Sequence, residues 1–194
     1  METYAEMEGK EGRAREDEEA QLARTAVHDR EAFLTLYDRY VVVIERYVTV
    51  RGGSSDVEDM VSITFSRALA RIESFHPERG SFAAWLFAIA RNAVADHYRE
   101  SARSTHYEPG LLAPAPQLGP EAAAIANEDA QWMWAALEAL TPDQRDALAL
   151  RYAGDLPFAV VAHILGKSTP AAKMLVQRGL HALRRYYERD QAHD

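Results

Sequence analysis

The side chains best suited to chemistry in this sequence are the basic residues near its C-terminal end. Between residues 167 and 189, six lysines and arginines stand against one acid, Glu188, although the 194-residue chain has a net charge of −8. A basic segment on an acidic protein can contact phosphates, but it neutralises too few of them to hold a duplex tightly. The charge pattern therefore predicts a DNA-binding protein that needs a partner.

Residue groupings that would support catalysis are missing. The chain has no cysteine, which excludes disulfides, thiolate metal sites and cysteine nucleophiles. Its seven histidines show no metal-ligand spacing. A triad of Asp96, His97 and Ser101 is unfavourable because adjacent residues on a helix do not face each other. No glycine-rich phosphate loop occurs either. We therefore expect neither an enzyme nor a bound cofactor or metal.

A helix-turn-helix is expected to position the basic residues. This motif needs a short helix, a turn that tolerates positive φ, and a second helix that crosses the first. Ala162 is the small residue at the crossing and Gly166 the turn. The apolar positions between the two helices are Val161, Leu165, Ala172 and Leu175. An ordinary helical hairpin, with Gly166 only as a C-cap, is the alternative.

Apolar side chains at steps of three and four predict further amphipathic helices upstream. The helical period is clear from Asp29, and capping residues place the starts of further helices at Ser55, Ser81 and Thr141. Residues 1–20 hold eight acids and three bases without an apolar stripe, so we expect a mobile acidic tail. The fold class is therefore all-α, with two small helical domains joined by a flexible linker. The expected boundaries are 1–20 for the tail, 22–103 for the first domain, 104–120 for the proline-rich linker and 121–190 for the helix-turn-helix domain.

Several stretches resemble the extracytoplasmic-function (ECF) sigma factors of bacterial RNA polymerase. In the first domain these are DREAFLTLYDRY (29–40), DVEDMVSITF (56–65) and FAAWLFAIARNAVADHYR (82–99), which look like sigma region 2. In the second domain, LTPDQRDALALRY (140–152) and the helix-turn-helix look like region 4. The resemblance implies a protein that binds core polymerase, recognises the −35 and −10 promoter elements and promotes DNA opening.

The resemblance implies that the helix after Ser55 binds RNA polymerase. The residues it implies for polymerase binding are Asp56, Glu58, Asp59 and Phe65. Acids in a first helical turn also stabilise the helix by about 0.3–1 kcal/mol each, which is the alternative explanation of the three carboxylates. The family usually has other, polar residues where this chain has Ser62 and Ile63.

The loop 73–80 and the helix after it correspond to the element that reads the −10 sequence. Base capture needs rings for stacking and donors for base edges. The implied residues are Phe75, His76, Arg91, Asn92 and Arg99. Phe82 and Trp85 also offer rings, but their place on the apolar stripe favours the core. Asn92 and Asp96 lie one turn apart and could instead pair with each other.

The second helix of the helix-turn-helix is expected to read the −35 element in the major groove. The implied residues are Lys167, Ser168, Thr169, Lys173, Gln177 and Arg178, with Lys167 and Arg178 better placed for phosphates. Ala171, Met174 and Leu175 replace residues that are commonly polar or basic in the family. Direct base readout should therefore be sparse.

The expected partners are bacterial RNA polymerase core, promoter DNA and an anti-sigma factor. A charged N-terminus and the lack of any apolar run of membrane length predict a cytoplasmic protein without membrane insertion. The alternative is a non-sigma helix-turn-helix regulator that binds duplex DNA alone. The acidic net charge and the 82–99 stretch favour the sigma factor.

Overall fold

The computed structural model describes residues 4–52, 56–101 and 132–192, and this part of the chain consists of helices joined by short turns, without strands. The expected linker 104–120 lies outside the described residues. The helices before it are α1 (Tyr4–Thr25), α2 (Arg30–Gly52), α3 (Val57–Ala70) and α4 (Phe82–Ser101), with 3-10 turns at Ile72–Ser74 and Pro77–Arg79. Residues 132–138 form a helical segment, followed by α6 (Pro142–Leu148), a π-helical turn η3 (Ala149–Ala153), α7 (Phe158–Leu165) and α8 (Thr169–Asp190).

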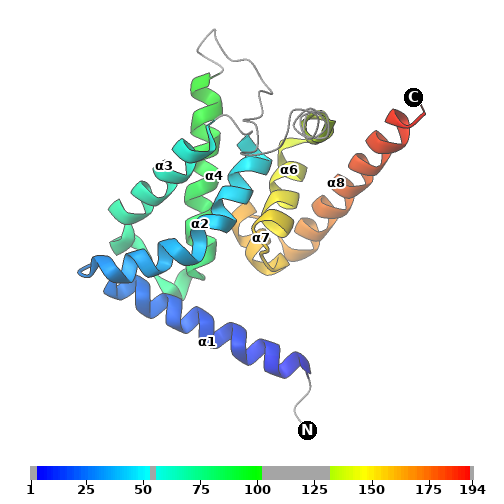
Figure 1. Cartoon of the computed structure of the whole chain (residues 1–194). Coiled ribbons are helices and arrows are strands. Elements are labelled where there is room, and N and C mark those ends of the chain that lie inside the picture. Colours follow the sequence, from blue (N-terminus) through cyan, green and yellow to red (C-terminus); the bar gives the residue numbers. More distant parts are fainter. Residues whose placement is uncertain (1–3, 53–55, 102–131, 193–194) are drawn as a thin grey trace, which may run out of the picture.

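The first domain packs α2, α3 and α4 around one apolar core, and α1 crosses its lower end (Figure 1). Leu36, Ile44 and Tyr47 of α2 and Leu86 and Phe87 of α4 are fully buried there. The expected cap of α4 is confirmed, because Ser81 Oγ accepts a hydrogen bond from the Ala84 N–H at 3.2 Å. The expected cap Ser55 lies outside the described residues, and α3 begins after Asp56, whose side chain makes no capping bond.

The expectation of a mobile tail over residues 1–20 is wrong, because the chain is helical from Tyr4. Ala20, Ala23 and Ala26 are buried against the first domain. Glu19 is buried as well and accepts a hydrogen bond from Tyr40 Oη at 2.6 Å. A stripe of alanines lets two helices approach closely while adding little to hydropathy, so the composition concealed a packing face.

The second domain is built on the expected helix starts. Thr141 Oγ1 accepts from the Gln144 N–H while the Gln144 side chain accepts from the Thr141 N–H, a complete capping box before Pro142. The helix expected from there to Tyr152 changes to the π-helical turn at Ala149. Gly166 ends α7 in the left-handed region, at φ 63° and ψ 36°, as the turn of a helix-turn-helix requires.

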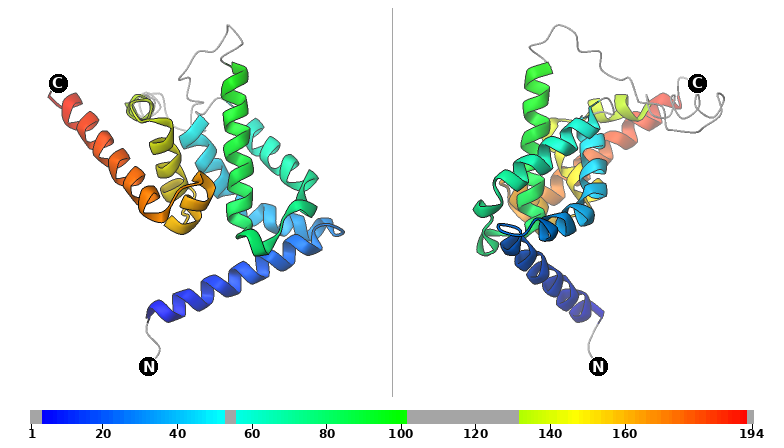
Figure 2. Two further views of the ribbon diagram at one scale, coloured as in Figure 1. Left: turned by 180° about the vertical axis from the view of Figure 1, so that it is seen from behind. Right: turned by 60° about the vertical axis from the view of Figure 1, so that its left-hand side comes forward.

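The two domains pack directly on each other, with η3 against α2 and α7 against α4 (Figure 2). One apolar cluster runs through both and includes Leu150 and Val161 of the second domain beside Phe87 of the first. Within the described part of the chain, no helix is both long enough and apolar enough to cross a membrane.

Candidate nucleic-acid and partner interfaces

The helix-turn-helix forms from α7, the Gly166 turn and α8. Val161, Ala162 and Ala172 are buried between the two helices, so the predicted small residue and two of the predicted apolar positions are confirmed as core. Val176 is buried in a second cluster with Leu148 of α6. Leu165 and Leu175 are half-buried beside them. At the start of α8, Ser168 Oγ accepts from the Ala171 N–H at 3.3 Å. The motif is therefore a packed unit that presents the outer face of α8.

The residues predicted for −35 recognition lie at the N-terminal half of α8. Lys173, Gln177 and Arg178 are exposed there. Lys167 Nζ pairs with Asp143 at 2.9 Å, and the ammonium group of Lys173 lies 5.7 Å from the centroid of the Phe158 ring. Ser168 caps the helix with its hydroxyl, and Thr169 is half-buried.

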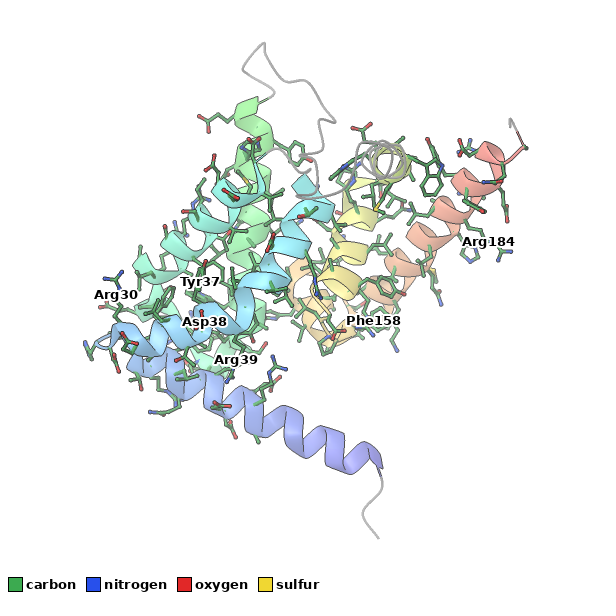
Figure 3. All side chains as sticks on the ribbon, in the orientation of Figure 1. Arg30, Tyr37, Asp38, Arg39, Phe158 and Arg184 are labelled. Carbon is green, nitrogen blue, oxygen red and sulfur yellow. The ribbon has the colours of Figure 1, made fainter. Side chains whose placement is uncertain are left out.

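Apolar side chains share this outer face of α8 with the cations. Met174 and Leu180 are both exposed by more than 40%. Figure 3 shows Arg184 further along α8, pointing away from the other helices. Arg184 Nε pairs there with Glu188 at 3.0 Å. The outer face of α8 therefore carries cations beside exposed apolar side chains, which could contact methyl groups of a ligand.

The residues predicted for −10 recognition divide into buried and exposed ones. Phe75 is only 8% exposed, because its ring packs edge-on against Phe82 and tilted against Trp85. Phe82, at 2% exposed, is core, as its place on the apolar stripe suggested. His76 is exposed and lies 3.5 Å from Glu78. The phenylalanine rings in and beside this loop are thus packed in the core of the domain, whereas the His76 ring is exposed.

Of the three polar residues predicted on α4, only Asn92 and Arg99 are exposed. Arg91 Nε donates to Asp146 of α6 at 2.8 Å, so the second domain occupies it. Asp96 pairs with Arg67 at 2.8 Å and with Arg99 at 3.1 Å, which leaves the alternative pair with Asn92 unsupported. Asn92 is thus exposed to solvent on α4.

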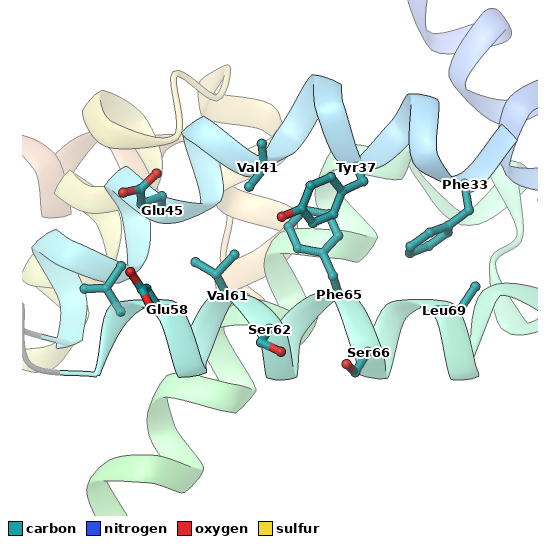
Figure 4. A pocket seen from close by; sticks show the side chains of 11 residues that line it. Phe33, Tyr37, Val41, Glu45, Glu58, Val61, Ser62, Phe65, Ser66 and Leu69 are labelled. Atoms are coloured by element: carbon teal, nitrogen blue, oxygen red, sulfur yellow. The ribbon is translucent and has the colours of Figure 1, made fainter. Parts of the chain in front are cut away.

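An apolar groove of about 470 Å³ lies between α2 and α3 (Figure 4). The rings of Tyr37 and Phe65 meet at its centre, 4.6 Å apart, while Phe33 and Leu69 line one end. Glu45 and Glu58 lie at the other end. Of the residues predicted for polymerase binding, Phe65 is thus a buried wall of this groove, and Glu58 is on its rim.

The two remaining predicted carboxylates lie near the start of α3. Asp59 is exposed, and Asp56 Oδ2 lies 2.9 Å from His97 Nε2 of α4. Asp56 therefore links α3 to α4 within the domain. The three carboxylates predicted for polymerase binding thus lie at the start of α3, whereas Phe65 lies in the middle of the helix.

Two buried carboxylates were missed by reasoning from the sequence. Asp146 is 2% exposed and binds Arg51 and Arg91 of the first domain. Glu19 is 2% exposed and binds Tyr40, Arg15 and Arg39. Burial, followed by the hydrogen bond and charge of Glu19, raises the pKa of Tyr40 above its ordinary value. The one signal for Asp146 was an acid inside the apolar run DALAL.

Comparison with known proteins places the chain among DNA-binding transcription factors of the sigma-70 class. The family model "Sigma-70 region 2" matches residues 36–104, and the model "Sigma-70, region 4" matches residues 130–183. Since the curated ECF sigma factor EcfG is also 33% identical to it, the chain belongs to the ECF group of RNA polymerase sigma factors.

Among curated relatives, the ECF sigma factor BldN of Streptomyces coelicolor is 34% identical over 84% of this chain. The chain spans only 63% of the length of that relative. EcfG of Rhodopseudomonas palustris is 33% identical over 68% of this chain and 71% of its own length. SigK of Mycobacterium tuberculosis is 28% identical over 87% of this chain and 92% of its own length.

Two solved structures share the fold. CnrH, in complex with the cytosolic domain of CnrY, matches with a TM-score of 0.68 and 24% identity over 89% of this chain and 99% of its own. The sigma factor RpoE of Bartonella quintana, in complex with the anti-sigma factor NepR, matches with a TM-score of 0.65 and 24% identity. That match covers 80% of this chain and 96% of RpoE.

Proposed function

We propose that this chain binds the core of a bacterial RNA polymerase in the cytoplasm and directs it to promoters with −35 and −10 elements. The observation that carries the proposal is the presence, in one chain, of a basic helix-turn-helix and a helical domain with a separate apolar groove. A regulator that binds duplex alone needs the first feature only. The protein acts by binding and not by catalysis.

The −35 element is read by the N-terminal half of α8. Lys173 and Gln177 are exposed one turn apart, where donors can reach base edges in the major groove. Lys167 and Arg178 flank them and contact phosphates, which position the helix without reading sequence. Met174 adds an apolar contact suited to a thymine methyl group.

The −10 element is read by α4 and the loop before it. Asn92 and Arg99 are exposed on α4 and offer donors to a single strand, while His76 in the loop offers a ring. Phe75 and Arg91 join this surface only when their present contacts rearrange. DNA opening is promoted when an unstacked base binds here, since its capture offsets part of the unpairing cost of a few kcal/mol.

Core polymerase docks on the α2–α3 groove. An apolar groove with carboxylates Glu45 and Glu58 at one end suits a helical element that combines apolar and basic side chains. Exposed Asp59 extends the acidic end. The same groove is the surface that a protein antagonist covers. The anti-sigma factor NepR in the complex of the structural neighbour RpoE supports that part of the proposal.

Run-off transcription with purified bacterial core polymerase tests the proposal. Reactions with and without the protein would use a pool of promoter fragments, and the variant would combine Asn92→Ala with Lys173→Ala. An Arg185→Ala protein serves as the control, since Arg185 is exposed on α8 beyond the proposed DNA contacts. We expect initiation that depends on the protein, persists in the control and disappears in the double variant.

A different outcome would identify a conventional regulator. If core polymerase gives no transcript while the protein alone shifts a palindromic duplex, the helix-turn-helix acts without polymerase. The α2–α3 groove would then serve another purpose.

A further inference from the structure

The contact between the two domains is as close as packing inside one domain. Gly154, at the end of η3, faces the Phe87 ring of α4, and a Cβ atom at that glycine would lie 2.8 Å from the nearest ring carbon. Leu150 and Phe87 are both fully buried in the shared cluster. The two domains thus share a single, tightly packed interface.

One buried carboxylate provides the strongest polar link across this interface. Asp146 of α6 has a side chain only 2% exposed, and its two oxygens accept hydrogen bonds from Arg51 of α2 and Arg91 of α4. Removal of one partner from such a buried group leaves an uncompensated charge, which is strongly destabilising. Burial alone would lower the pKa of Arg91, but the hydrogen bond and charge of Asp146 outweigh it and raise that pKa. The Arg91 guanidinium therefore stays charged in this link.

Some buried polar groups near this interface lack hydrogen-bond partners. Among the described side chains, the buried polar atoms without a hydrogen-bond partner are Tyr47 Oη and Arg145 Nε. Burial and then the charge of Asp146 raise the pKa of Tyr47, while burial and then the charge of Arg51 lower the pKa of Arg145. Both side chains therefore lie near the Asp146–Arg51 pair. Buried polar groups without partners cost free energy that water would return. Separation of the domains is therefore partly compensated by hydration of these two groups.

The closed arrangement also conflicts with the proposed binding to two promoter elements. The −35 and −10 positions are about 25 base pairs apart, or about 85 Å along a duplex. A compact chain of 194 residues measures only about 40 Å across. Residues 102–131 between the domains reach about 100 Å if fully extended, so covalent length permits separation.

The second domain covers part of the −10 surface as well. A cavity of about 260 Å³ beside the loop is lined by Phe75, His76 and Trp85 of the first domain. Its remaining wall includes His163 and Ile164 of α7. Arg91, a proposed −10 contact, is bound by Asp146. A strand of DNA entering this cavity would meet α7.

We infer that this chain has a closed resting conformation locked by Asp146 with Arg51 and Arg91, and that the lock must open before promoter DNA is bound. The need for opening rests on the proposed sigma function, whereas the lock rests on the interface alone. Asp146 is a positioning residue here, because it touches no DNA and acts by holding the two domains together.

A distance measurement in the full-length protein tests the lock without polymerase or DNA. The chain has no cysteine, so Glu73→Cys and Arg185→Cys, both at exposed positions, accept two labels selectively. Electron-electron double resonance between nitroxides on these sites reports the separation of the domains. We expect one narrow distribution of distances for the otherwise unchanged chain.

Asp146→Asn is expected to raise the ratio of open to closed molecules by about tenfold or more. Arg51→Gln removes the same link from the first domain, so it keeps the test valid if Asp146→Asn fails to fold by circular dichroism. The matched control is Asp143→Asn, one turn earlier in α6. It breaks the Asp143–Lys167 pair, which lies inside the second domain.

The lock is supported if Asp146→Asn and Arg51→Gln open the molecule while Asp143→Asn does not. It is overturned if the two variants keep the narrow distance, if the control opens equally, or if the unchanged chain is already open. A further sample with core polymerase and promoter DNA separates the two proposals. Variants that open while polymerase has no effect would leave the lock correct and the sigma function wrong.

Discussion

Lys173 and Arg91 show how differently two basic side chains of similar expected role are placed. Lys173 is exposed on α8, whereas Arg91 is held by the buried Asp146. An exposed cation can bind a phosphate or a base without breaking a strong contact. A cation in a buried ion pair must first lose its partner, which costs free energy. Residue type alone therefore does not decide which cation binds DNA first.

Replacement of Lys173 tests the assignment of base contacts on α8. We expect Lys173→Ala to weaken binding of the polymerase complex to −35 DNA by about 1–3 kcal/mol and to relax the preference at one base pair. Lys167→Ala should weaken all sequences alike and reduce the salt slope by about one. Titration of labelled duplexes at several salt concentrations measures both. Equal, sequence-independent losses would place Lys173 on the phosphates.

Tyr47 allows a prediction about stability at alkaline pH. Burial, followed by the charge of Asp146, raises the pKa of this phenol, while in the unfolded chain it titrates near about 10. The folded state thus keeps a proton that the unfolded state loses, so stability should fall above about pH 10, by up to about 1.4 kcal/mol per pH unit for each such tyrosine.

Tyr47→Phe should reduce that alkaline loss. Because Tyr47 Oη has no partner, the variant should also be more stable at pH 7, by about 1 kcal/mol. Urea unfolding between pH 7 and 11 tests both statements, with Tyr40, a second buried phenol, retained in the variant. A destabilised Tyr47→Phe protein would mean that the hydroxyl has a partner after all.

At the scale of elements, α1 is a structural part of the first domain. Its buried alanines pack on the domain, and Arg39 reaches from α2 to Glu18 and Glu19 (Figure 3). The buried side chain of Glu19 accepts hydrogen bonds from Arg15, Arg39 and Tyr40, which compensate for the water it loses on burial. The helix is thus attached by both packing and hydrogen bonds.

Glu19→Gln should lower the free energy of unfolding by about 1.5–3 kcal/mol, because hydrogen bonds to a charged group are lost at a buried site. Glu16→Gln, which changes an exposed acid earlier in the same helix, should leave stability unchanged. Chemical denaturation of both proteins gives the comparison. Two unaffected proteins would indicate that α1 is not held by this contact.

A second prediction at the scale of elements concerns the α2–α3 groove. Leu69 lines the groove and is 44% exposed, while Ile63 is an exposed apolar residue of α3 outside it. Leu69→Glu should weaken binding to core polymerase by at least about tenfold, since a charge would be buried in an apolar contact. Ile63→Glu should retain binding. Similar losses in both would place the partner on the outer face of α3.

At the scale of the whole molecule, the distribution of charge limits what the free protein can do. The chain has a net charge of −8, whereas residues 167–189, which include most of α8, hold six bases and one acid. Such a molecule is repelled by DNA at long range and attracted only where α8 faces the duplex. Polymerase binding is therefore expected to supply most of the affinity for a promoter.

The free protein should accordingly bind duplex DNA weakly and with a shallow salt dependence. With about four phosphates neutralised by α8, the slope of log K against log salt should not exceed about −4. Fluorescence anisotropy on a promoter fragment from 50 to 300 mM salt measures it. A slope near that of a tight dimeric repressor, about −10, would favour a regulator that binds DNA alone.

Much of the local structure follows from short-range signals in the chain. The Ser81 cap, the Thr141 capping box and the Gly166 turn all form as their residue types require. These features depend on hydrogen bonds between neighbours in sequence, so no distant contact is needed to predict them. The exposed site residues Lys173, Gln177 and Asn92 follow equally from helical periodicity.

The sequence by itself determined the helices, the helix-turn-helix and the resemblance to sigma factors, because each depends on spacing along the chain. The tertiary structure alone decided that α1 packs on the first domain, that Asp146 binds Arg51 and Arg91, and that the two domains share one core. The physical reason is that a buried charge is stable only beside partners from other helices. Spacing along one segment carries no information about which distant residues those partners are.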